Sequence, residues 1–341
     1  MITLKIDLGR LKHNLGQIKT KTNAKIYAVV KANAYGHGVE ICKYITQSVY
    51  GFAVSNALEA AELIATGIKN PILILCPSGK KTDGNIIHTV CDLKGLDQLN
   101  SCKIALKINS GMNRLGLDHK QMPNVTDKLK SRPDLILTDI FTHFSCVESA
   151  DTQLKIFKSA TKNLKNSKEI SFHACASNAL VLNKNFHLDA IRCGLAMYGY
   201  PFGISCATAE INLKPVLKAY AKVLQINDVK RGSRVGYGSF FAPKNMTIAV
   251  ISAGYADGFR RSQGRKVMID GTACPVFSCV CMDMCLVDIT HLKTPLKIGS
   301  KAYILDDSLC AMTLANELNT VPYEILTSFS SKRIIREYVD N

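Results

Sequence analysis

A lysine stands directly after a short apolar run near the start of the chain. Residues 26–30 (IYAVV) are apolar, and Lys31 opens the string KANAYGHG, which contains a tyrosine and two glycines. An amine held at the end of a buried strand is partly desolvated, which favours its neutral, nucleophilic form. Glycines let a loop backbone approach a phosphate closely. The string therefore suggests a Schiff-base lysine beside an anion site, whereas a strand-end lysine that extends its amine into solvent is the structural alternative.

The first two hundred residues contain eight short apolar runs that are rich in isoleucine, valine and leucine. Helical patterns lie between several of them, for example at residues 57–66 and 153–164. Strand–helix alternation repeated eight times predicts an α/β fold, a (β/α)8 TIM-type barrel, in which catalytic groups stand at the carboxyl ends of the strands. A doubly wound parallel sheet is the alternative, because spacing alone does not reveal closure. The eight predicted strands are residues 26–30, 51–54, 72–75, 86–90, 104–108, 135–141, 170–173 and 188–192.

Beyond residue 212 the pattern changes to short strands separated by turns that contain glycine and aspartate. A long strand is expected at residues 213–226 and one helix at residues 313–318. A length of 341 residues also corresponds to about two domains. We therefore predict a barrel domain over residues 1–212 and a C-terminal mainly-β domain over residues 213–341. The remaining strands of the second domain are expected at residues 247–251, 266–269, 274–280, 285–289 and 302–305.

The composition is that of a folded, basic protein. Hydrophobic residues make up 47% of the chain and charged residues 21%, which excludes a disordered chain. The formal net charge of +16 is spread along the sequence, and its densest cluster, residues 260–266, lacks interleaved aromatic side chains. A solvated basic surface is therefore the main interpretation of this charge, and nucleic-acid binding is the alternative.

The cysteines and the N-terminus indicate a reducing cytoplasm. Thirteen scattered cysteines cannot all pair in disulfides and do not have the spacing of a metal site. The N-terminal string MITLKIDLGRLKHNL lacks the apolar core of a signal peptide, and no apolar run reaches the ~18 residues that a membrane-spanning helix needs. We expect a cytoplasmic protein with no metal site and no membrane or nucleic-acid partner.

Seven short strings are distributed along almost the whole chain. They are VVKANAYGHG, KINSGMNRLG, FTHF, DAIRCGLAMYG, VGYG, GYADG and VCMD. In sequence and in order they resemble strings of the alanine racemases, enzymes of PLP fold type III that bind pyridoxal 5′-phosphate (PLP) in a barrel followed by a β domain. The resemblance implies an isomerase that interconverts L- and D-alanine, supplies D-alanine for peptidoglycan and works as a homodimer with shared active sites.

The resemblance assigns two residues to proton transfer. Lys31 corresponds to the lysine that binds PLP covalently and serves as one acid–base group, and Tyr237 corresponds to the second group, contributed by the partner subunit. Racemisation needs two groups because a planar carbanion loses a proton on one face and gains one on the other. A phenol is a weak base, so Tyr237 needs cationic or hydrogen-bonding neighbours.

The resemblance also implies how the cofactor is held. Arg192 corresponds to the arginine that faces the pyridine nitrogen, and a guanidinium that stays protonated cannot give the ring a proton. His173 belongs to the hydrogen-bond network near the ring. The other residues expected at PLP are Tyr35, His143, Ser177, Gly194 and Leu195, the last two through their backbone amides.

The substrate residues follow from the same resemblance. Arg114 and the backbone N–H of Met282 are expected to bind the substrate carboxylate, and Tyr255 to shape the pocket. Lys107 corresponds to a lysine that is often carbamylated in the family, and a carbamate there would be an anion that fixes Arg114.

Three positions depart from the family pattern. Asn109 stands where an aspartate is usual, which removes a negative charge near the carboxylate site. Ala176 replaces the asparagine that usually precedes the phosphate-binding serine. Lys332 replaces the C-terminal tyrosine that contacts the phosphate, so we predict that its ammonium makes this contact instead.

These departures keep other functions open. A racemase acting on serine or on a broader set of amino acids is one alternative, because the departures weaken the argument for strict alanine specificity. A non-catalytic PLP-binding protein is another, although such proteins lack a second domain and therefore Tyr237. A related decarboxylase of the same architecture would need a substrate site other than GYADG and VCMD.

Overall fold

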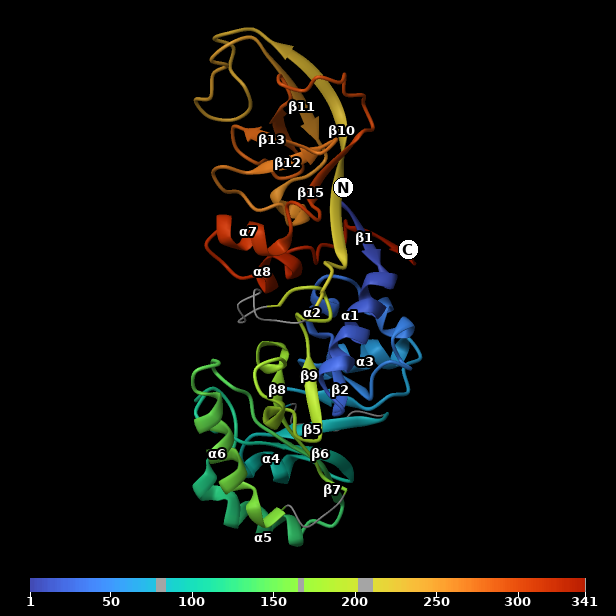
Figure 1. Ribbon diagram of the computed structural model, residues 1–341, viewed down its shortest axis with the longest axis vertical. Helices are drawn as coiled ribbons and strands as arrows, with labels where there is room; N and C mark the ends of the chain where they lie inside the picture. Colours follow the sequence, from blue (N-terminus) through green and yellow to red (C-terminus); the bar gives the residue numbers. More distant parts are fainter. Residues whose placement is uncertain (78–83, 165–168, 202–210, 341) are drawn as a thin grey trace. The chain divides into compact units, whose positions relative to one another are not determined.

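Eight parallel strands of the first structural unit close into a barrel (Figure 1). The computed structural model describes residues 1–77, 84–164, 169–201 and 211–340. Closure is made by the last strand, which pairs with the first from Lys25–Ala190 to Ala28–Cys193. This confirms the predicted barrel and shows that the alternative, an open doubly wound sheet, is wrong. The strands are β2 (Lys25–Val29), β3 (Gly51–Val54), β4 (Ile72–Ile74), β5 (Ile86–Val90), β6 (Cys102–Lys107), β7 (Leu135–Phe141), β8 (Ser171–Ala176) and β9 (Ala190–Cys193).

The barrel strands read as continuous apolar runs because both of their faces are covered. Every residue of β5 and of β9 is buried, as expected of a parallel sheet that has side chains inside and helices outside. Two helices, α3 (Ala57–Ala65) and α6 (Ala150–Ala160), occupy the predicted helical segments. The others include α1 (Leu8–Lys21), α4 (Leu93–Gln98) and α5 (Met122–Lys130). None of the helices within the described ranges combines the length and apolar character of a transmembrane segment.

The second unit is built on an eight-stranded sheet with the order β11-β14-β13-β12-β15-β10-β1-β16. It comprises Met1–Arg10, Tyr35–Gly38 and the chain from Pro215 onward. The predicted mainly-β domain is thereby confirmed, while the boundary at residues 212 and 213 stays a prediction. The elements are β1 (Thr3–Asp7), β10 (Leu217–Val229), β11 (Met246–Ile251), β12 (Lys266–Ile269), β13 (Thr272–Phe277), β14 (Cys285–Asp288), β15 (Lys301–Leu305), α7 (Ala311–Glu317), α8 (Pro322–Thr327) and β16 (Ile335–Val339).

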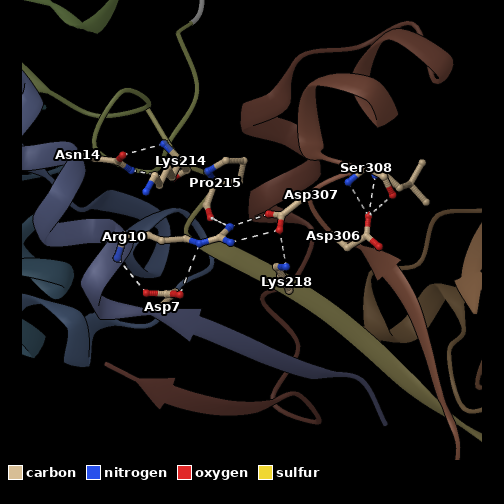
Figure 2. Close-up of polar contacts among 10 residues, drawn as sticks. Asp7, Arg10, Asn14, Lys214, Pro215, Lys218, Asp306, Asp307 and Ser308 are labelled. Carbon is tan, nitrogen blue, oxygen red and sulfur yellow. Dashed lines mark hydrogen bonds and ion pairs between the residues drawn. The ribbon is translucent and has the colours of Figure 1, made fainter. Parts of the chain in front are cut away.

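The first ten residues belong to this second unit, and their strand in its sheet was not predicted from the sequence. β1 pairs antiparallel with β10 and parallel with β16. Arg10, just after β1, donates to both carboxylate oxygens of Asp307, at 2.6 and 3.2 Å, and to the carbonyl of Pro215 (Figure 2). Lys218 reaches the same carboxylate at 2.5 Å, and the hydrogen bonds from Arg10 and Lys218 lower the pKa of Asp307 to about 2. The cluster ties the segment after β1 and the segment after β15 to the start of β10.

A left-handed helical turn follows β2. Residues Lys31–Tyr35 form α2, in which Ala32, Asn33 and Ala34 all have φ and ψ between 51° and 53°, and Tyr35 has φ of 52°. Left-handed backbone costs a residue with a Cβ about 1–2 kcal/mol. The turn therefore stores strain next to Lys31, which is where active sites tend to concentrate it.

Replacing Ala32 by glycine should stabilise the protein. Ala32 is exposed, so the change removes left-handed strain without opening a cavity, and the added freedom of the unfolded chain offsets part of the gain. We expect the free energy of unfolding to rise by about 0.5–1 kcal/mol. The matched control is Ala61→Gly in the right-handed helix α3, which should lower it by about 1 kcal/mol. Denaturant titrations that give both variants the same sign would contradict this account.

Candidate active site

Residues that the sequence singled out stand at the carboxyl ends of five barrel strands. Lys31 follows β2, Lys107 ends β6, His143 follows β7, Ser177 follows β8 and Arg192 lies in β9. Because the strands are parallel and the sheet is closed, these ends surround one mouth of the barrel. The strands β8, β9 and β2 are consecutive around the barrel, so Ser177, Arg192 and Lys31 come from neighbouring strands.

The turn that carries Lys31 is held by side chains from its surroundings. The Glu59 carboxylate accepts hydrogen bonds from the amides of Ala32 (2.8 Å) and Ser55 (2.6 Å). Asn33 Oδ1 accepts from the amide of Val39 at 2.8 Å. The Lys31 side chain itself is exposed. Glu59 and Asn33 support this turn, and both were missed in the sequence analysis. Their hydrogen bonds depend on the left-handed backbone of the turn, which no residue pattern in the sequence predicts.

Arg192 is a buried cation held by neutral acceptors. Its side chain is 3% exposed and donates to the carbonyls of Thr142 (2.5 Å), Ala174 (3.0 Å) and His173 (3.2 Å). It also meets His173 Nδ1 at 2.6 Å and His143 Nδ1 at 3.4 Å. Burial lowers the pKa of Arg192 to about 10, which leaves it charged at neutral pH.

The two histidines beside Arg192 are neutral. Burial, followed by the charge of Arg192, lowers the pKa of His143 to about 3. Burial also lowers the pKa of His173, and Arg192 acts in the same direction. Neutral imidazoles can accept hydrogen bonds from the guanidinium, which a protonated ring could not do. The structure thus brings Arg192, His143 and His173 together in one cluster.

Ser177, Gly194 and Leu195 form a compact group after β8 and β9. Ser177 Oγ accepts hydrogen bonds from the amides of Gly194 (3.0 Å) and Ala196 (3.2 Å) and lies 3.8 Å from Cys193 Sγ, a contact in which either atom can donate. The amide of Leu195 has no acceptor among the described residues, although Leu195 is fully buried. Hydroxyl and buried amide donors are typical of anion sites, so this group is a candidate anion site.

Lys107 is the last residue of β6, and Arg114 lies in the loop that follows it. This loop returns to the end of the strand at Leu117. The loop is closed by hydrogen bonds between Asn109 N–H and Leu117 O (2.9 Å) and between Leu117 N–H and Lys107 O (2.8 Å). Gly116 has φ of +134°, and a Cβ there would lie 2.6 Å from the nitrogen of Asn109, so glycine is required. Arg114 is exposed, whereas Lys107 is 7% exposed. Burial lowers the pKa of Lys107, and the charges of Arg114 and Arg192 lower it further.

The remaining predicted residues belong to the second unit. Tyr35 is buried and packs edge-on against Tyr323, with ring centroids 5.6 Å apart. The segment Tyr35–Gly38 is held by β16, because Arg336 donates to Gly36 O (3.1 Å) and Tyr338 donates to His37 O (3.3 Å). The C-terminal strand thus positions the tyrosine that follows the lysine turn.

Tyr255 and Met282 lie on two turns that pack together. The amides of Tyr255 and Ala256 donate to the carbonyls of Cys281 and Met282, both at 3.0 Å. A Cβ on Gly254 would lie 2.0 Å from Met282 O, so this contact also requires glycine. The amide of Met282 has no acceptor in the described part of the chain, and both side chains are about half exposed.

Lys332 is exposed and adjoins these turns through its neighbour in sequence. Arg333 forms ion pairs with Asp257 (3.3 Å) and Asp283 (2.7 Å), one on each turn.

Tyr237 lies between Gly236 and Gly238 and is 74% exposed. Phe240 and Phe241 of the same loop are 39% and 50% exposed, which makes the loop an exposed aromatic surface.

The structure is that of a two-domain protein with an eight-stranded barrel, in which an amine, a buried guanidinium and backbone amides stand at the carboxyl ends of the strands, the place where barrel enzymes carry their active sites. Family models match both units: alanine racemase, N-terminal domain, over residues 6–201 and alanine racemase, C-terminal domain, over residues 216–338. The chain belongs to the alanine racemase family, whose members use PLP. The predicted family and enzyme class are therefore confirmed.

Individual relatives match over nearly their whole length. The alanine racemase of Mannheimia succiniciproducens is 34% identical, with 99% of each chain covered. That of Haemophilus influenzae is also 34% identical, covering 99% of this chain and 98% of the relative. The alanine racemase structure from Clostridium difficile 630 has a TM-score of 0.93 at 28% identity, covering 100% of this chain and 96% of that one. The structure from Bacillus anthracis with bound L-Ala-P has a TM-score of 0.92 at 28% identity, with 100% and 95% covered.

Proposed function

We propose that the protein interconverts L- and D-alanine with PLP as its cofactor. The observation that carries the proposal is the set of three groups at the carboxyl ends of the neighbouring strands β8, β9 and β2: an anion site at Ser177, a buried cation at Arg192 and the amine of Lys31. PLP presents a phosphate, a ring nitrogen and an aldehyde, which are the complements of these three groups. Full-length similarity to alanine racemases supports the choice of substrate.

The side chains and amides present fit PLP. The phosphate would be held by the Ser177 hydroxyl and the Leu195 amide, with Tyr35 and Lys332 as further donors. The Gly194 amide, which was also predicted at the phosphate, donates to Ser177 Oγ in this structure and would support that hydroxyl. The Leu195 amide, buried and without an acceptor in the described residues, is a donor that the phosphate would satisfy. His143 would pack by the ring. When bound, PLP supplies an electron sink for the negative charge that develops on the substrate α-carbon.

The two acid–base groups of this chain act from opposite sides. Lys31 Nζ takes or gives the α-proton on one face, and Tyr237 Oη does so on the other. We place Tyr237 in the partner's active site, so the protein would be a homodimer with shared sites. The exposed loop that carries Tyr237, Phe240 and Phe241 supports this, because exposed aromatic patches mark interaction surfaces.

Arg192 would keep the pyridine nitrogen from gaining a proton. A guanidinium that remains charged at neutral pH donates a hydrogen bond but no proton. Held in this unprotonated state by Arg192, the cofactor would supply a weaker electron sink than a pyridinium, which would limit side reactions such as transamination.

The substrate carboxylate would meet Arg114 and the amide of Met282, beside Tyr255. Carbamylation of Lys107 requires a neutral amine, and the lowered pKa of this buried lysine favours that form. The carbamate would be an anion placed to orient Arg114. D-alanine made in the cytoplasm for peptidoglycan is the role that we propose for the product.

A racemisation assay over a panel of L-amino acids tests the function directly. We expect loss of optical rotation with L-alanine and a much slower reaction with L-serine and larger amino acids. Similar rates across the panel would indicate a broad-specificity racemase. A protein that binds PLP, shown by its visible absorbance, but is inert on the whole panel would overturn the proposal in favour of a non-catalytic PLP-binding protein.

Ser177→Ala should weaken cofactor binding. The change removes the hydroxyl that accepts from two amides and would donate to the phosphate, which corresponds to an affinity loss of about tenfold. Titration of the cofactor-free protein with PLP, followed by visible absorbance, measures the loss. The control is Ser171→Ala at the opposite end of β8, whose buried hydroxyl has no partner among the described residues. Equal affinities for the two variants would contradict the assignment of Ser177.

A further inference from the structure

A carboxylate lies inside the barrel behind Arg192. Asp139 of β7 is 2% exposed and accepts hydrogen bonds from His173 Nε2 (3.2 Å), Tyr27 Oη (3.0 Å) and Thr138 Oγ1 (2.7 Å). The same His173 ring meets Arg192 Nη1 through Nδ1 at 2.6 Å. One imidazole therefore joins Asp139 to Arg192.

The two contacts fix the tautomer of His173. A guanidinium only donates hydrogen bonds, so Nδ1 must offer its lone pair to Arg192. The ring proton is then on Nε2, where it points to the Asp139 carboxylate. The opposite tautomer would set two donors against each other at Arg192 and leave Asp139 without its ring partner. A carboxylate on one ring nitrogen is a common way of determining the state of the other.

The same contacts balance a buried charge. Within the described residues Arg192 forms no direct ion pair, and its contacts are carbonyls and imidazoles. Burial acts to raise the pKa of Asp139, but the hydrogen bonds from His173, Thr138 and Tyr27 outweigh it and hold the pKa below its usual range. The negative charge of Asp139 is therefore present at neutral pH, one ring away from Arg192.

The His173 ring is also fixed by packing. It stacks on Phe141, with centroids 5.1 Å apart and planes 4° apart, and it contacts the ring of Tyr27 at 5.6 Å. Arg192 lies over the same Phe141 ring, 5.1 Å from its centroid. The imidazole is thus a rigid connector between the two charged groups.

We propose that Asp139 is a positioning residue of the active site, which fixes the orientation of Arg192 and balances its charge through the Nε2–H tautomer of His173. The proposal rests on the proposed function, in which Arg192 faces the pyridine ring of PLP. Asp139 itself touches neither cofactor nor substrate.

The tautomer is tested by nitrogen NMR of the holoenzyme labelled at histidine. The His173 signals are assigned by their absence in His173→Gln. We expect an unprotonated Nδ1 and a protonated Nε2. A protonated Nδ1, alone or together with Nε2, would overturn the proposal, and this measurement does not depend on activity or on whether any Asp139 variant folds.

The role of the charge is tested with Asp139→Asn, which keeps the shape and one accepting oxygen. We expect kcat for alanine to fall about 10- to 100-fold, with bound PLP retained but its visible absorbance maximum shifted, because the charge behind the ring has changed. A control substitution outside this network should leave kcat and absorbance close to those of the original enzyme. Asp134→Asn, five residues upstream and in contact with Arg132, is the matched control for the substitution itself.

The outcomes separate the two proposals. Unchanged kcat and absorbance in Asp139→Asn, or equal losses in Asp139→Asn and Asp134→Asn, would show that Asp139 does not position Arg192. A holoenzyme that binds PLP but does not racemise alanine would refute the proposed function, while the absorbance shift and the His173 signals would still decide the role of Asp139.

Discussion

Lys31→Ala should abolish alanine racemisation, with a fall in kcat of about 10⁴-fold, the upper end of what one acid–base group contributes. The effect is large because the variant loses both the covalent attachment of PLP and one proton carrier. Borohydride reduction followed by peptide mass analysis measures the attachment: the original protein should carry PLP on Lys31, and the variant on no lysine.

The matched control is Lys25→Ala, which removes a lysine from the opposite end of the same strand, where its amine lies over the ring of Tyr50. This variant should retain both the attachment and the activity. Reduction that labels a lysine other than Lys31 in the original protein would refute the assignment.

Tyr237→Phe should lower kcat about 10²–10⁴-fold while PLP content stays unchanged, because only the phenol oxygen is removed. The loss of the phenol oxygen should also affect the two enantiomers of alanine differently. In deuterium oxide, exchange of the α-hydrogen should continue for the enantiomer served by Lys31 and stop for the other. Nuclear magnetic resonance of each enantiomer reports this exchange.

Tyr44→Phe, which alters another exposed tyrosine, should leave both exchange rates unchanged. If Tyr237→Phe slows exchange of the two enantiomers equally, Tyr237 does not act on a single face. In that case a two-base mechanism with Lys31 and Tyr237 would be excluded.

The sequence predicted most of the barrel because each strand carries its own local signal. All eight apolar runs became strands, and β3, β5 and β7 have the bounds that were predicted. β1 and β16 were missed because they pair with each other across more than three hundred residues. No residue of β16 is fully buried, so its sequence lacks the apolar pattern that identified the barrel strands.

The residues of the candidate site were predicted from sequence motifs. Residues that support them through contacts between distant parts of the chain were missed. Asp139 interrupts the apolar run LILTDIF, a signal that could have been noticed, but its partners become visible only when β7, β8 and β9 lie side by side. Asn109 was interpreted as a lost charge. In the structure its amide donates to Asn113 Oδ1 (2.9 Å) and its oxygen accepts from the amides of Gly111 and Asn113, a combination that aspartate could not make.

The hydrogen bonds from β16 to residues 35–38 have a consequence for folding during synthesis on the ribosome. Arg336 and Gly36 are 300 residues apart in the chain. At about 5–20 residues per second, a ribosome needs roughly 15–60 s to traverse that interval. During this time the segment that bears Tyr35 is without its final anchor, and β1 is without one of its two neighbours. A nascent chain that stops a few residues early would therefore contain every barrel strand but lack the hydrogen bonds from Arg336 and Tyr338 that hold residues 35–38.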